Sequence, residues 1–390
     1  MRNPLSEKIV NIPPSGIRKF FDIVSEMKDA ISLGVGEPDF ETPWHIREEG
    51  IYSLEKGRTF YTSNAGLKPL KVEICEYLKR RCGVTYDPDG EVLVSVGGSE
   101  AIDLAMRAML NDGDEVLVPQ PSYVSYMPCV TLADGVPVAI QLEEKDQFRL
   151  TPEKLLEKIT DKTKILVLPF PNNPTGAIME REDLEKIVEI VLEKDLFVVS
   201  DEIYSELTYG DEPHVTIASF PGMKERTVLI NGFSKAYAMT GWRLGYAAAP
   251  AAILEQMLKI HQYAIMCAPT TSQYAAISAL KNGDPDVAMM RESYNQRRRF
   301  LLHAFAEMGI ECFEPKGAFY TFPNIKRFGM TSEEFATRLL QEEKVAVVPG
   351  TAFGDCGEGF VRISYAYSLK NLKEALSRIE RFINRLDGKA

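Results

Sequence analysis

The chain has 390 residues, 45% hydrophobic and 26% charged, which is the composition of a globular protein with room for one large domain and a smaller one. Its formal net charge of −11 leaves no surplus of basic residues to neutralise phosphates, and this excludes a general nucleic-acid binder. No run approaches the roughly 18 apolar residues that span a membrane, and the six scattered cysteines and four scattered histidines indicate reduced thiols in the cytoplasm and no metal site.

Residues 1–45 are expected to form an N-terminal arm and a covering segment rather than a domain. They contain the pair Pro13-Pro14, a short helical pattern over residues 17–27, and a turn rich in glycine and proline at residues 34–39. We expect this segment to pack with the smaller domain.

Apolar runs alternate with helical patterns through residues 46–283, which is typical of a mostly parallel sheet with helices on both faces. The helix expected at 100–110 places Ile102, Ala105, Met106 and Met109 on one face. Several expected strands are continuous runs of Val, Ile and Leu, as in strands that are buried on both sides. We therefore predict an α/β fold whose large domain spans residues 46–283, with strands at 91–96, 115–118, 137–141, 164–169, 196–200, 226–230 and 243–248.

Residues 284–390 have a different character and predict a small α+β domain. A long helix at 284–308 precedes short strands at 317–323, 345–348 and 360–364, and a closing helix is expected at 369–386. The long helix carries a basic cluster, Arg297 to Arg299, which we interpret as a solvated helix face.

Polar motifs follow several of the expected strands, at the edge of the sheet where ligands bind in folds of this kind. Gly97, Gly98 and Ser99 lie between a strand and a helix, where free backbone N–H groups and the helix dipole form an anion site. Asn173 precedes a proline, which holds its backbone extended and its amide at a fixed point. Each motif taken alone is also compatible with an ordinary turn.

Asp201 ends a buried apolar run, and Tyr204 follows it by three residues. A carboxylate in that place is costly unless it faces a cation, such as the protonated nitrogen of a pyridine ring. Tyr204 could then donate to a hydroxyl of the same ring. The alternative is that Asp201 caps a helix.

Lys235 comes just after the apolar run 227–230, and Arg243 follows in a turn marked by glycines. A lysine at the end of a buried strand loses its proton readily and forms a Schiff base with an aldehyde. An arginine nearby can hold a phosphate with two hydrogen bonds. A lone lysine after a strand is usually exposed, but the whole series of motifs indicates pyridoxal phosphate (PLP), an aldehyde that carries a phosphate.

The segment from Gly232 to Gly245 resembles the lysine-attachment pattern of class I aminotransferases, PLP-dependent enzymes of fold type I similar to aspartate and aromatic aminotransferases, and the resemblance extends over nearly the whole chain. It implies that Lys235 forms the Schiff base and moves the substrate proton, and that Asp201 keeps the pyridine nitrogen protonated. It further implies a set of cofactor contacts: Asn173 and Tyr204 at the ring oxygen, Tyr123 on the ring face, and Gly98, Ser99, Glu100 and Arg243 at the phosphate.

The same resemblance implies that Arg362 binds the substrate carboxylate and that the backbone of Gly36 lies over the substrate. Tyr61 matches a tyrosine that reaches the phosphate of the neighbouring subunit, which implies a homodimer with shared active sites. The chain departs from many relatives at Gly232, where a serine often binds the phosphate, and Ser234 is the candidate replacement.

These residues imply ping-pong transfer of an amino group from an amino acid to a 2-oxo acid, with aspartate, aromatic and alanine donors all open. A C–S β-lyase could use the same Lys235 and Asp201 on this fold. A PLP-binding transcription regulator is the alternative of another class, and it is expected to carry an additional DNA-binding module and a basic surface.

Overall fold

The computed structural model describes residues 2–14, 16, 27, 29–210 and 212–388. Its helices are α1 (Glu7–Val10), α3 (Trp44–Glu55), α4 (Lys68–Cys82), α5 (Gly98–Met109), α6 (Tyr126–Leu132), α7 (Pro152–Lys158), α8 (Arg181–Glu193), α9 (Ala251–Ala264), α10 (Thr270–Asn282), α11 (Asp284–Glu307), α12 (Ser332–Glu343) and α13 (Leu369–Leu386). Its strands are β1 (Ile31–Ser32), β2 (Val92–Ser95), β3 (Glu115–Gln120), β4 (Val136–Gln141), β5 (Thr163–Leu168), β6 (Phe197–Asp201), β7 (Thr227–Gly232), β8 (Gly245–Ala248), β9 (Tyr320–Thr321), β10 (Val345–Ala346), β11 (Val348–Pro349) and β12 (Val361–Ser364). The helical pattern expected at 17–27 falls almost entirely outside the described residues.

The central sheet has seven strands in the order β2-β8-β7-β6-β5-β3-β4. Strand β8 runs antiparallel to both of its neighbours, and the pairs β7–β6, β6–β5, β5–β3 and β3–β4 are parallel. Every strand predicted between residues 91 and 248 is present, which confirms the mostly parallel α/β fold. Several boundaries differ from the prediction by one or two residues; in particular, β8 begins at Gly245, and Arg243 lies before it in a left-handed turn with φ of 53°.

Both faces of the sheet are covered by helices, and this explains the continuous apolar runs of the strands. Within β7, Val228 and Ile230 pack on the side of α5, α6 and α9, whereas Leu229 packs on the side of α3, α4 and α10. Within β5, Leu166 faces a third cluster that includes side chains of α7 and α8. Side chains of successive residues point to opposite faces, so a strand between two layers needs apolar residues at every position.

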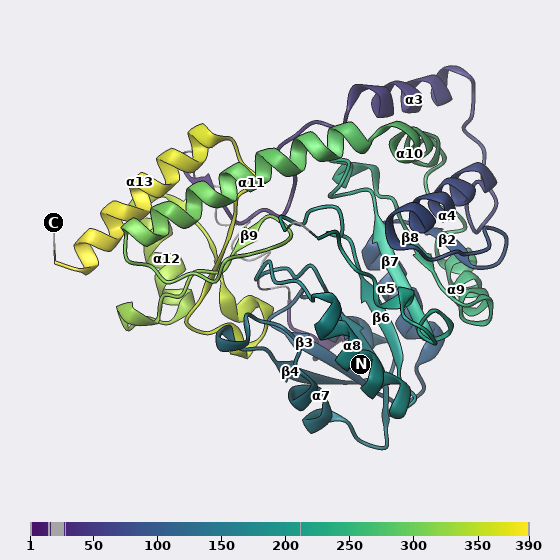
Figure 1. Cartoon of the computed structure of the whole chain (residues 1–390), viewed down its shortest axis with the longest axis horizontal. Helices are drawn as coiled ribbons and strands as arrows, with labels where there is room; N and C mark the ends of the chain where they lie inside the picture. Colours follow the sequence, from purple (N-terminus) through teal and green to yellow (C-terminus); the bar gives the residue numbers. More distant parts are fainter. Residues whose placement is uncertain (1, 15, 17–26, 28, 211, 389–390) are drawn as a thin grey trace.

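A smaller unit lies beside the sheet, and α11 runs from α10 across to it (Figure 1). Its core is formed by side chains of α11, α12 and α13 with those of β9 and β12, which belong to the antiparallel sheet β11-β12-β9. The segment predicted as one strand at 345–348 is divided, because β10 pairs with β1 and β11 pairs with β12. Pairing of β1 with β10 joins the N-terminal segment to this unit; the domain boundaries at 45/46 and 283/284 stay a prediction.

The basic cluster of α11 is not a solvated face, so that interpretation was wrong for two of its three residues. Arg297 and Arg298 are buried, and their side chains pair with Asp39 at 2.6 Å and with Glu314 at 2.8 Å. Only Arg299 is exposed, with 61% of its side chain accessible. Asp39 is distant from Arg297 in the sequence, whereas Glu314 lies 16 residues from Arg298. Buried charges are tolerated when they are paired in this way.

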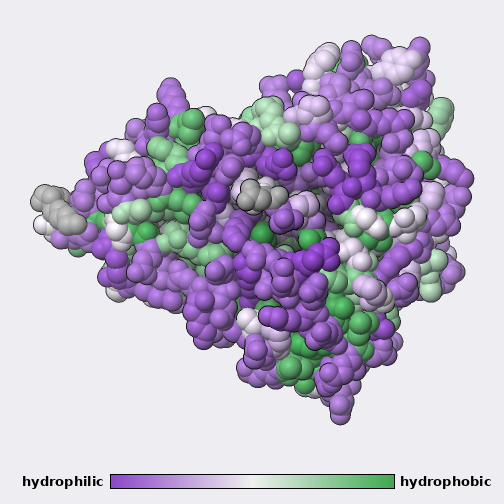
Figure 2. Space-filling model, viewed as in Figure 1, coloured by the Kyte–Doolittle hydropathy of each residue, from purple (hydrophilic) through white to green (hydrophobic). Residues whose placement is uncertain are grey.

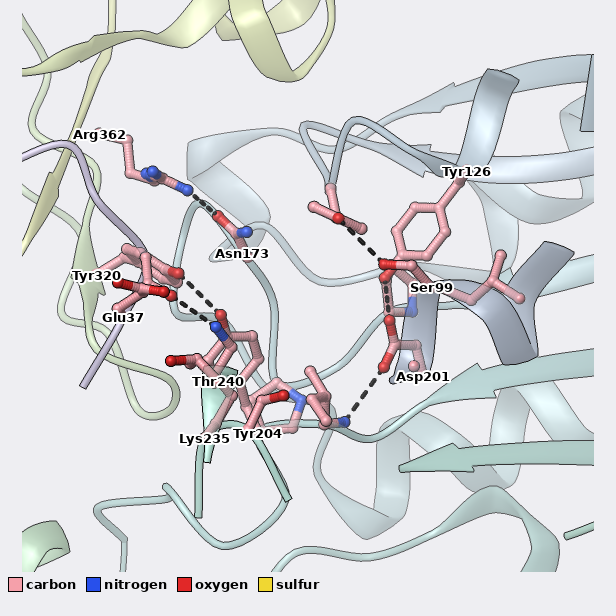
Figure 3. A pocket seen from close by; sticks show the side chains of 18 of the residues that line it. Glu37, Ser99, Tyr126, Asn173, Asp201, Tyr204, Lys235, Thr240, Tyr320 and Arg362 are labelled. Carbon is pink, nitrogen blue, oxygen red and sulfur yellow. Dashed lines mark hydrogen bonds between the residues drawn. The ribbon is translucent and has the colours of Figure 1, made fainter. Parts of the chain in front are cut away.

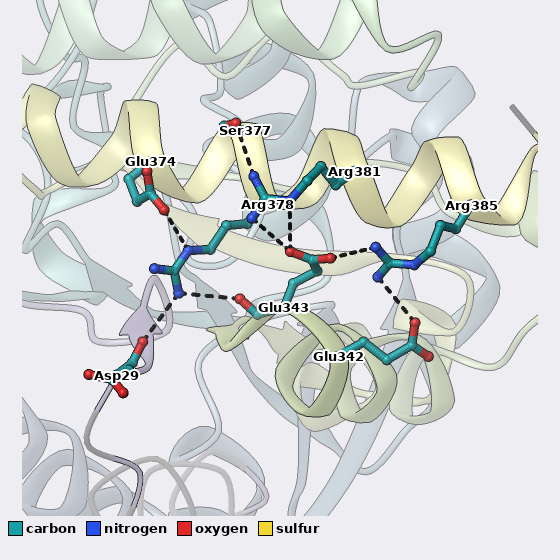
Figure 4. A network of polar contacts seen from close by, with 8 residues as sticks. All are labelled: Asp29, Glu342, Glu343, Glu374, Ser377, Arg378, Arg381 and Arg385. Carbon is teal, nitrogen blue, oxygen red and sulfur yellow. Dashed lines mark hydrogen bonds and ion pairs between the residues drawn. The ribbon is translucent and has the colours of Figure 1, made fainter. Parts of the chain in front are cut away.

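An ion-pair network, here named the Glu343 network, joins α12, α13 and the segment before β1 (Figure 4). Glu343 is buried at the end of α12 and accepts from Arg381 at 2.9 Å and from Arg385 at 2.6 Å. Arg378 donates to the carbonyl oxygens of Asp29 and Glu343. The three arginines recur at a spacing that places them on one face of α13.

The surface in Figure 2 is hydrophilic over most of its area, with hydrophobic residues gathered in smaller patches. Among the described residues, no helix is both long enough and apolar enough to cross a membrane.

Candidate active site

A pocket of about 500 Å³ opens beyond the carboxyl ends of the parallel strands, where the sheet meets the smaller unit. A cavity of this size is within the ordinary range for small-molecule sites. Loops after β3, β5, β6 and β7 contribute side chains to it, as do the first turn of α5 and strands β9 and β12. Its lining consists of Gly36, Glu37, Gly98, Ser99, Ile102, Tyr123, Tyr126, Pro169, Pro171, Asn173, Asp201, Ile203, Tyr204, Ser234, Lys235, Thr240, Gly241, Arg243, Tyr320 and Arg362.

Eleven of the thirteen residues predicted for the site line this pocket; Glu100 and Tyr61 do not. Tyr61 is 80% exposed and lies away from the lining. The sequence missed Tyr126, Tyr320, Glu37 and Thr240, which all face the pocket (Figure 3).

The turn at the start of α5 is held very close to the Arg243 guanidinium. Gly97 has φ of +84°, and a Cβ on it would lie 2.8 Å from Nη2 of Arg243. A Cβ on Gly245 would lie 2.7 Å from the Gly98 nitrogen, so the β8 backbone also packs on this turn. Unpaired N–H groups of a first helical turn beside a guanidinium form a site suited to a phosphate.

The neighbours Ser99 and Glu100 point in different directions. The Ser99 hydroxyl faces the pocket and lies 3.3 Å from the Tyr123 hydroxyl. The Glu100 carboxylate turns away, accepts from the Val96 N–H and lies 2.7 Å from Nδ1 of His261. Glu100 could therefore reach a phosphate only through its backbone, and that contact stays a prediction.

Asp201 ends β6 and is 7% exposed. The Tyr126 hydroxyl donates to its Oδ2 at 2.7 Å, and the Ile203 N–H donates to Oδ1 at 3.2 Å. Burial raises the pKa of Asp201 above its ordinary value, and the two hydrogen bonds oppose that rise. No cation among the described residues forms an ion pair with it, so the carboxylate is ready for a positively charged partner.

Lys235 lies three residues beyond β7, and its Nζ donates to the Gly36 carbonyl at 2.6 Å. Burial lowers the pKa of Lys235 from 10.5 to about 8; the charges of Arg362 and Arg243 add to the decrease, and Glu37 opposes it. A substantial share of this amine is therefore neutral, and thus nucleophilic, near pH 8.

Gly232 and Ser234 precede Lys235 and differ in the room around them. A Cβ on Gly232 would lie 3.0 Å from Gly245 Cα and 3.1 Å from the Leu244 carbonyl oxygen, so a side chain there would be crowded. Ser234 is buried and lines the pocket. The packing of β7 on β8 thus favours glycine at position 232.

Arg362 approaches the pocket from β12 and is 2% exposed. Its Nη1 donates to Asn173 Oδ1 at 2.7 Å, its Nη2 donates to the Gly34 carbonyl, and its Nε has no partner among the described residues. The guanidinium lies between the rings of Tyr320 and Phe353, with centroids at 4.4 and 4.8 Å. A planar cation held between two rings is well placed for a carboxylate.

Tyr204 and Tyr320 join the sheet unit to the smaller unit, since their hydroxyls lie 2.8 Å apart. The Gly36 backbone is close to them, because a Cβ on Gly36 would lie 2.3 Å from the Tyr320 hydroxyl. Glycine is therefore required at position 36 by this close approach.

The lining residues suit PLP. Figure 3 shows Asp201, Tyr126 and Ser99 on one side of the pocket and Arg362 and Asn173 on the other. The protonated pyridine ring of PLP would supply the cation that the buried Asp201 carboxylate needs. Its phosphate would supply the anion that suits the α5 turn and Arg243. Together with an amine of lowered pKa at the carboxyl edge of a mostly parallel sheet, these features define a PLP-dependent transferase of fold type I.

Comparison with known proteins leads to the same class of enzyme. Residues 28–379 match the family model described as aminotransferase class I and II. The chain is 48% identical to an aspartate aminotransferase of Pyrococcus abyssi, over 97% of this chain and 98% of the relative. It is 44% identical to aromatic-amino-acid aminotransferase 2 of Thermococcus litoralis, over the same shares of the two chains. The crystal structure of an aromatic aminotransferase from Pyrococcus horikoshii superposes with a TM-score of 0.91 at 46% identity, covering 95% of this chain and 99% of that one.

The chain therefore belongs to the class I and II aminotransferase family. The family expected from the segment 232–245 is confirmed, as are the fold, the PLP cofactor and the aminotransferase reaction.

Proposed function

We propose that this aminotransferase takes its amino group from a donor of the aspartate or aromatic type, with aromatic donors favoured. The observation that carries the proposal is the set of cations in the pocket: among the described lining residues they are Lys235, Arg243 and Arg362. Each of the three already has a proposed role: Lys235 in the amine chemistry, Arg243 in phosphate binding and Arg362 in binding the α-carboxylate. The rest of the lining, which would contact the substrate side chain, includes several tyrosines. An aspartate side chain needs a further cation from outside this lining.

Lys235 is the proposed catalytic base, and it would hold the cofactor aldehyde between turnovers. Bound PLP supplies an aldehyde that captures amines and a ring that takes up the electron pair left on the substrate α-carbon. With a pKa of about 8, Lys235 could accept the α-proton of the substrate near neutral pH and then act as the acid that donates a proton. Arg362 is proposed to bind the α-carboxylate and thereby orient the α-proton toward Lys235.

The remaining predicted residues are proposed to hold the cofactor. Asp201 would accept from the protonated ring nitrogen, and Asn173 and Tyr204 would bind the ring oxygen. Tyr123 would lie on the ring face. The phosphate would take the first turn of α5 at Gly98, Ser99 and the Glu100 backbone, with Ser234 and Arg243, and the Gly36 backbone would cover the substrate; the shared pocket lining supports these positions.

A panel of amino donors with 2-oxoglutarate tests the donor preference. The rate for each donor is followed through the absorbance of the cofactor. We expect tyrosine and phenylalanine to exceed aspartate and alanine in kcat/KM, and a preference for aspartate would contradict the proposal. Release of pyruvate and ammonia without an oxo-acid acceptor would instead indicate the β-lyase reaction. Lys235→Ala must abolish transamination while PLP remains bound.

We also propose a homodimer in which Tyr61 reaches the phosphate site of the partner subunit. The exposed aromatic side chains of Phe60, Tyr61 and Tyr263, each at least 80% accessible, support an interface there. Mixing inactive Tyr61→Ala and Lys235→Ala subunits tests it, because a hybrid dimer would contain one complete site. Activity that does not recover on mixing would argue for self-contained sites.

Location in the cytoplasm is part of the proposal and is supported by six cysteines that are all free thiols.

A further inference from the structure

His261 is a fully buried imidazole on α9 that the proposed mechanism does not use. Its Nδ1 lies 2.7 Å from Oε1 of Glu100, and its Nε2 is buried with no hydrogen-bond partner among the described residues. Buried polar atoms are nearly always paired, so an unpaired one calls for an explanation.

The Glu100 contact fixes which nitrogen of His261 carries the proton. An ionised carboxylate only accepts hydrogen bonds, so Nδ1 must be the donor. The Nδ1–H of His261 is therefore the hydrogen-bond donor to Glu100, and Nε2 has no partner among the described residues.

Glu100 in turn holds the turn that leads into α5. Its Oε2 accepts from the Val96 N–H, immediately after β2. The Ser95 hydroxyl fixes the same turn from the other side by donating to the Gly97 carbonyl at 3.0 Å. The backbone N–H groups of Gly98 and Ser99 are thus presented from a turn whose shape depends on where the Glu100 carboxylate is held.

The Glu100 carboxylate is also an anion in the first turn of a helix, where a phosphate is proposed to bind. Both anions favour the same positive end of the helix, and their charges repel each other. Held by the His261 and Val96 donors, the carboxylate faces away from the pocket. Without His261 it keeps one donor and can turn toward the free N–H groups, in competition with the phosphate.

We propose that His261 is a positioning residue for the phosphate anchor of PLP: its Nδ1–H holds Glu100 away from the α5 amides and fixes the turn that presents them. This inference rests on the proposed phosphate site at α5 and Arg243. His261 lies 161 residues from Glu100 and would act on the cofactor only through it.

Titration of the full-length apoprotein with PLP and with pyridoxal, which has no phosphate, tests the inference by the change in cofactor absorbance. His261→Phe removes the donor and keeps a ring, whereas His261→Asn keeps an N–H near the place of Nδ1. We expect the Kd for PLP to rise on the order of tenfold in His261→Phe, as for a lost hydrogen bond to a charged group. The Kd for pyridoxal should stay unchanged, and His261→Asn should recover most of the PLP affinity. The exposed His303, changed to Asn, serves as the control and should leave both values unchanged.

Equal losses for PLP and pyridoxal in His261→Phe would overturn the inference, since they would indicate a general disturbance of the fold. A loss in His261→Asn as large as that in His261→Phe would overturn it as well, and so would no loss in either. Failure of the phosphate site itself is a separate result: the unmodified protein would then bind PLP no more tightly than pyridoxal. Thermal unfolding of each apoprotein shows that the compared variants are folded.

Discussion

Removing the Tyr126 hydroxyl tests whether a hydrogen bond from this lining residue controls the charge of Asp201. Tyr126 is buried and donates to Asp201 Oδ2 at 2.7 Å, while the Ile203 N–H serves the other oxygen at 3.2 Å. Tyr126→Phe deletes the shorter of these two bonds and keeps the ring in place. Burial already raises the pKa of Asp201, so losing a donor to the ionised form raises the pKa further.

The size of the effect follows from the hydrogen bond. A bond to a charged group contributes about 1.5–3 kcal/mol, which corresponds to about one to two pKa units. In its proposed role Asp201 is a carboxylate, so protonating it would remove the partner of the ring nitrogen. A raised pKa means that this loss begins at higher pH as the solution is acidified.

The assay is the pH profile of kcat/KM, which reports ionisations of the free enzyme. We expect the acid limb of Tyr126→Phe to move to higher pH by about one unit or more. Tyr294→Phe is the matched control, since Tyr294 is fully buried and its hydroxyl has no partner among the described residues. An acid limb of Tyr126→Phe that coincides with those of the unmodified protein and of the control would refute the reasoning.

Three further predictions concern Lys235, Arg362 and Gly36. A pKa of Lys235 of about 8 in the folded state against 10.5 means that the unfolded apoprotein binds more protons than the folded one between these pH values, so the free energy of unfolding rises with pH across that window. Below pH 8 the free energy of unfolding of Lys235→Met should exceed that of the unmodified apoprotein by up to about 3 kcal/mol. In urea titrations this difference should close toward pH 10.5. Arg362→Lys should lower kcat/KM about 100-fold for every amino donor with PLP affinity unchanged, because lysine cannot bind a carboxylate bidentately; an unchanged KM would exclude the assigned role. Gly36→Ala places a Cβ 2.3 Å from the Tyr320 hydroxyl, and we expect kcat/KM to fall about tenfold or more at full PLP content; kinetics at the unmodified rate would show that the segment moves freely.

Much of the fold was predictable because it depends on local patterns. Strands buried on both sides require apolar residues at every position, so β5, β6 and β7 appear in the sequence as continuous runs. The carboxyl ends of parallel strands meet at one edge, which is why Lys235, Asp201 and Asn173 could be expected to share a pocket before any coordinates were known.

The missed features depend on contacts between segments far apart in the chain. Tyr126 lies 75 residues from Asp201, and His261 lies 161 residues from Glu100. Nothing in the local sequence identifies either pair, because a tyrosine or histidine that pairs with a distant carboxylate cannot be distinguished by its neighbours from one that only fills space in an apolar helix. The burial of Arg297 was missed for the same reason, since its acidic partner lies 258 residues away.

The backbone from Gly34 to Gly36 contacts both Arg362 and Lys235, the two cations proposed to bind the substrate carboxylate and to move its proton. Arg362 donates to the Gly34 carbonyl, and Lys235 donates to the Gly36 carbonyl, so the same three residues contact both cations. This stretch continues from β1, which is paired with β10 and preceded by the Asp29 carbonyl that Arg378 of the Glu343 network binds. A displacement of the stretch alters the surroundings of both cations together. Substitutions in α12 or α13 that displace this stretch would therefore alter the surroundings of Arg362 and Lys235 together while the pocket lining stays the same.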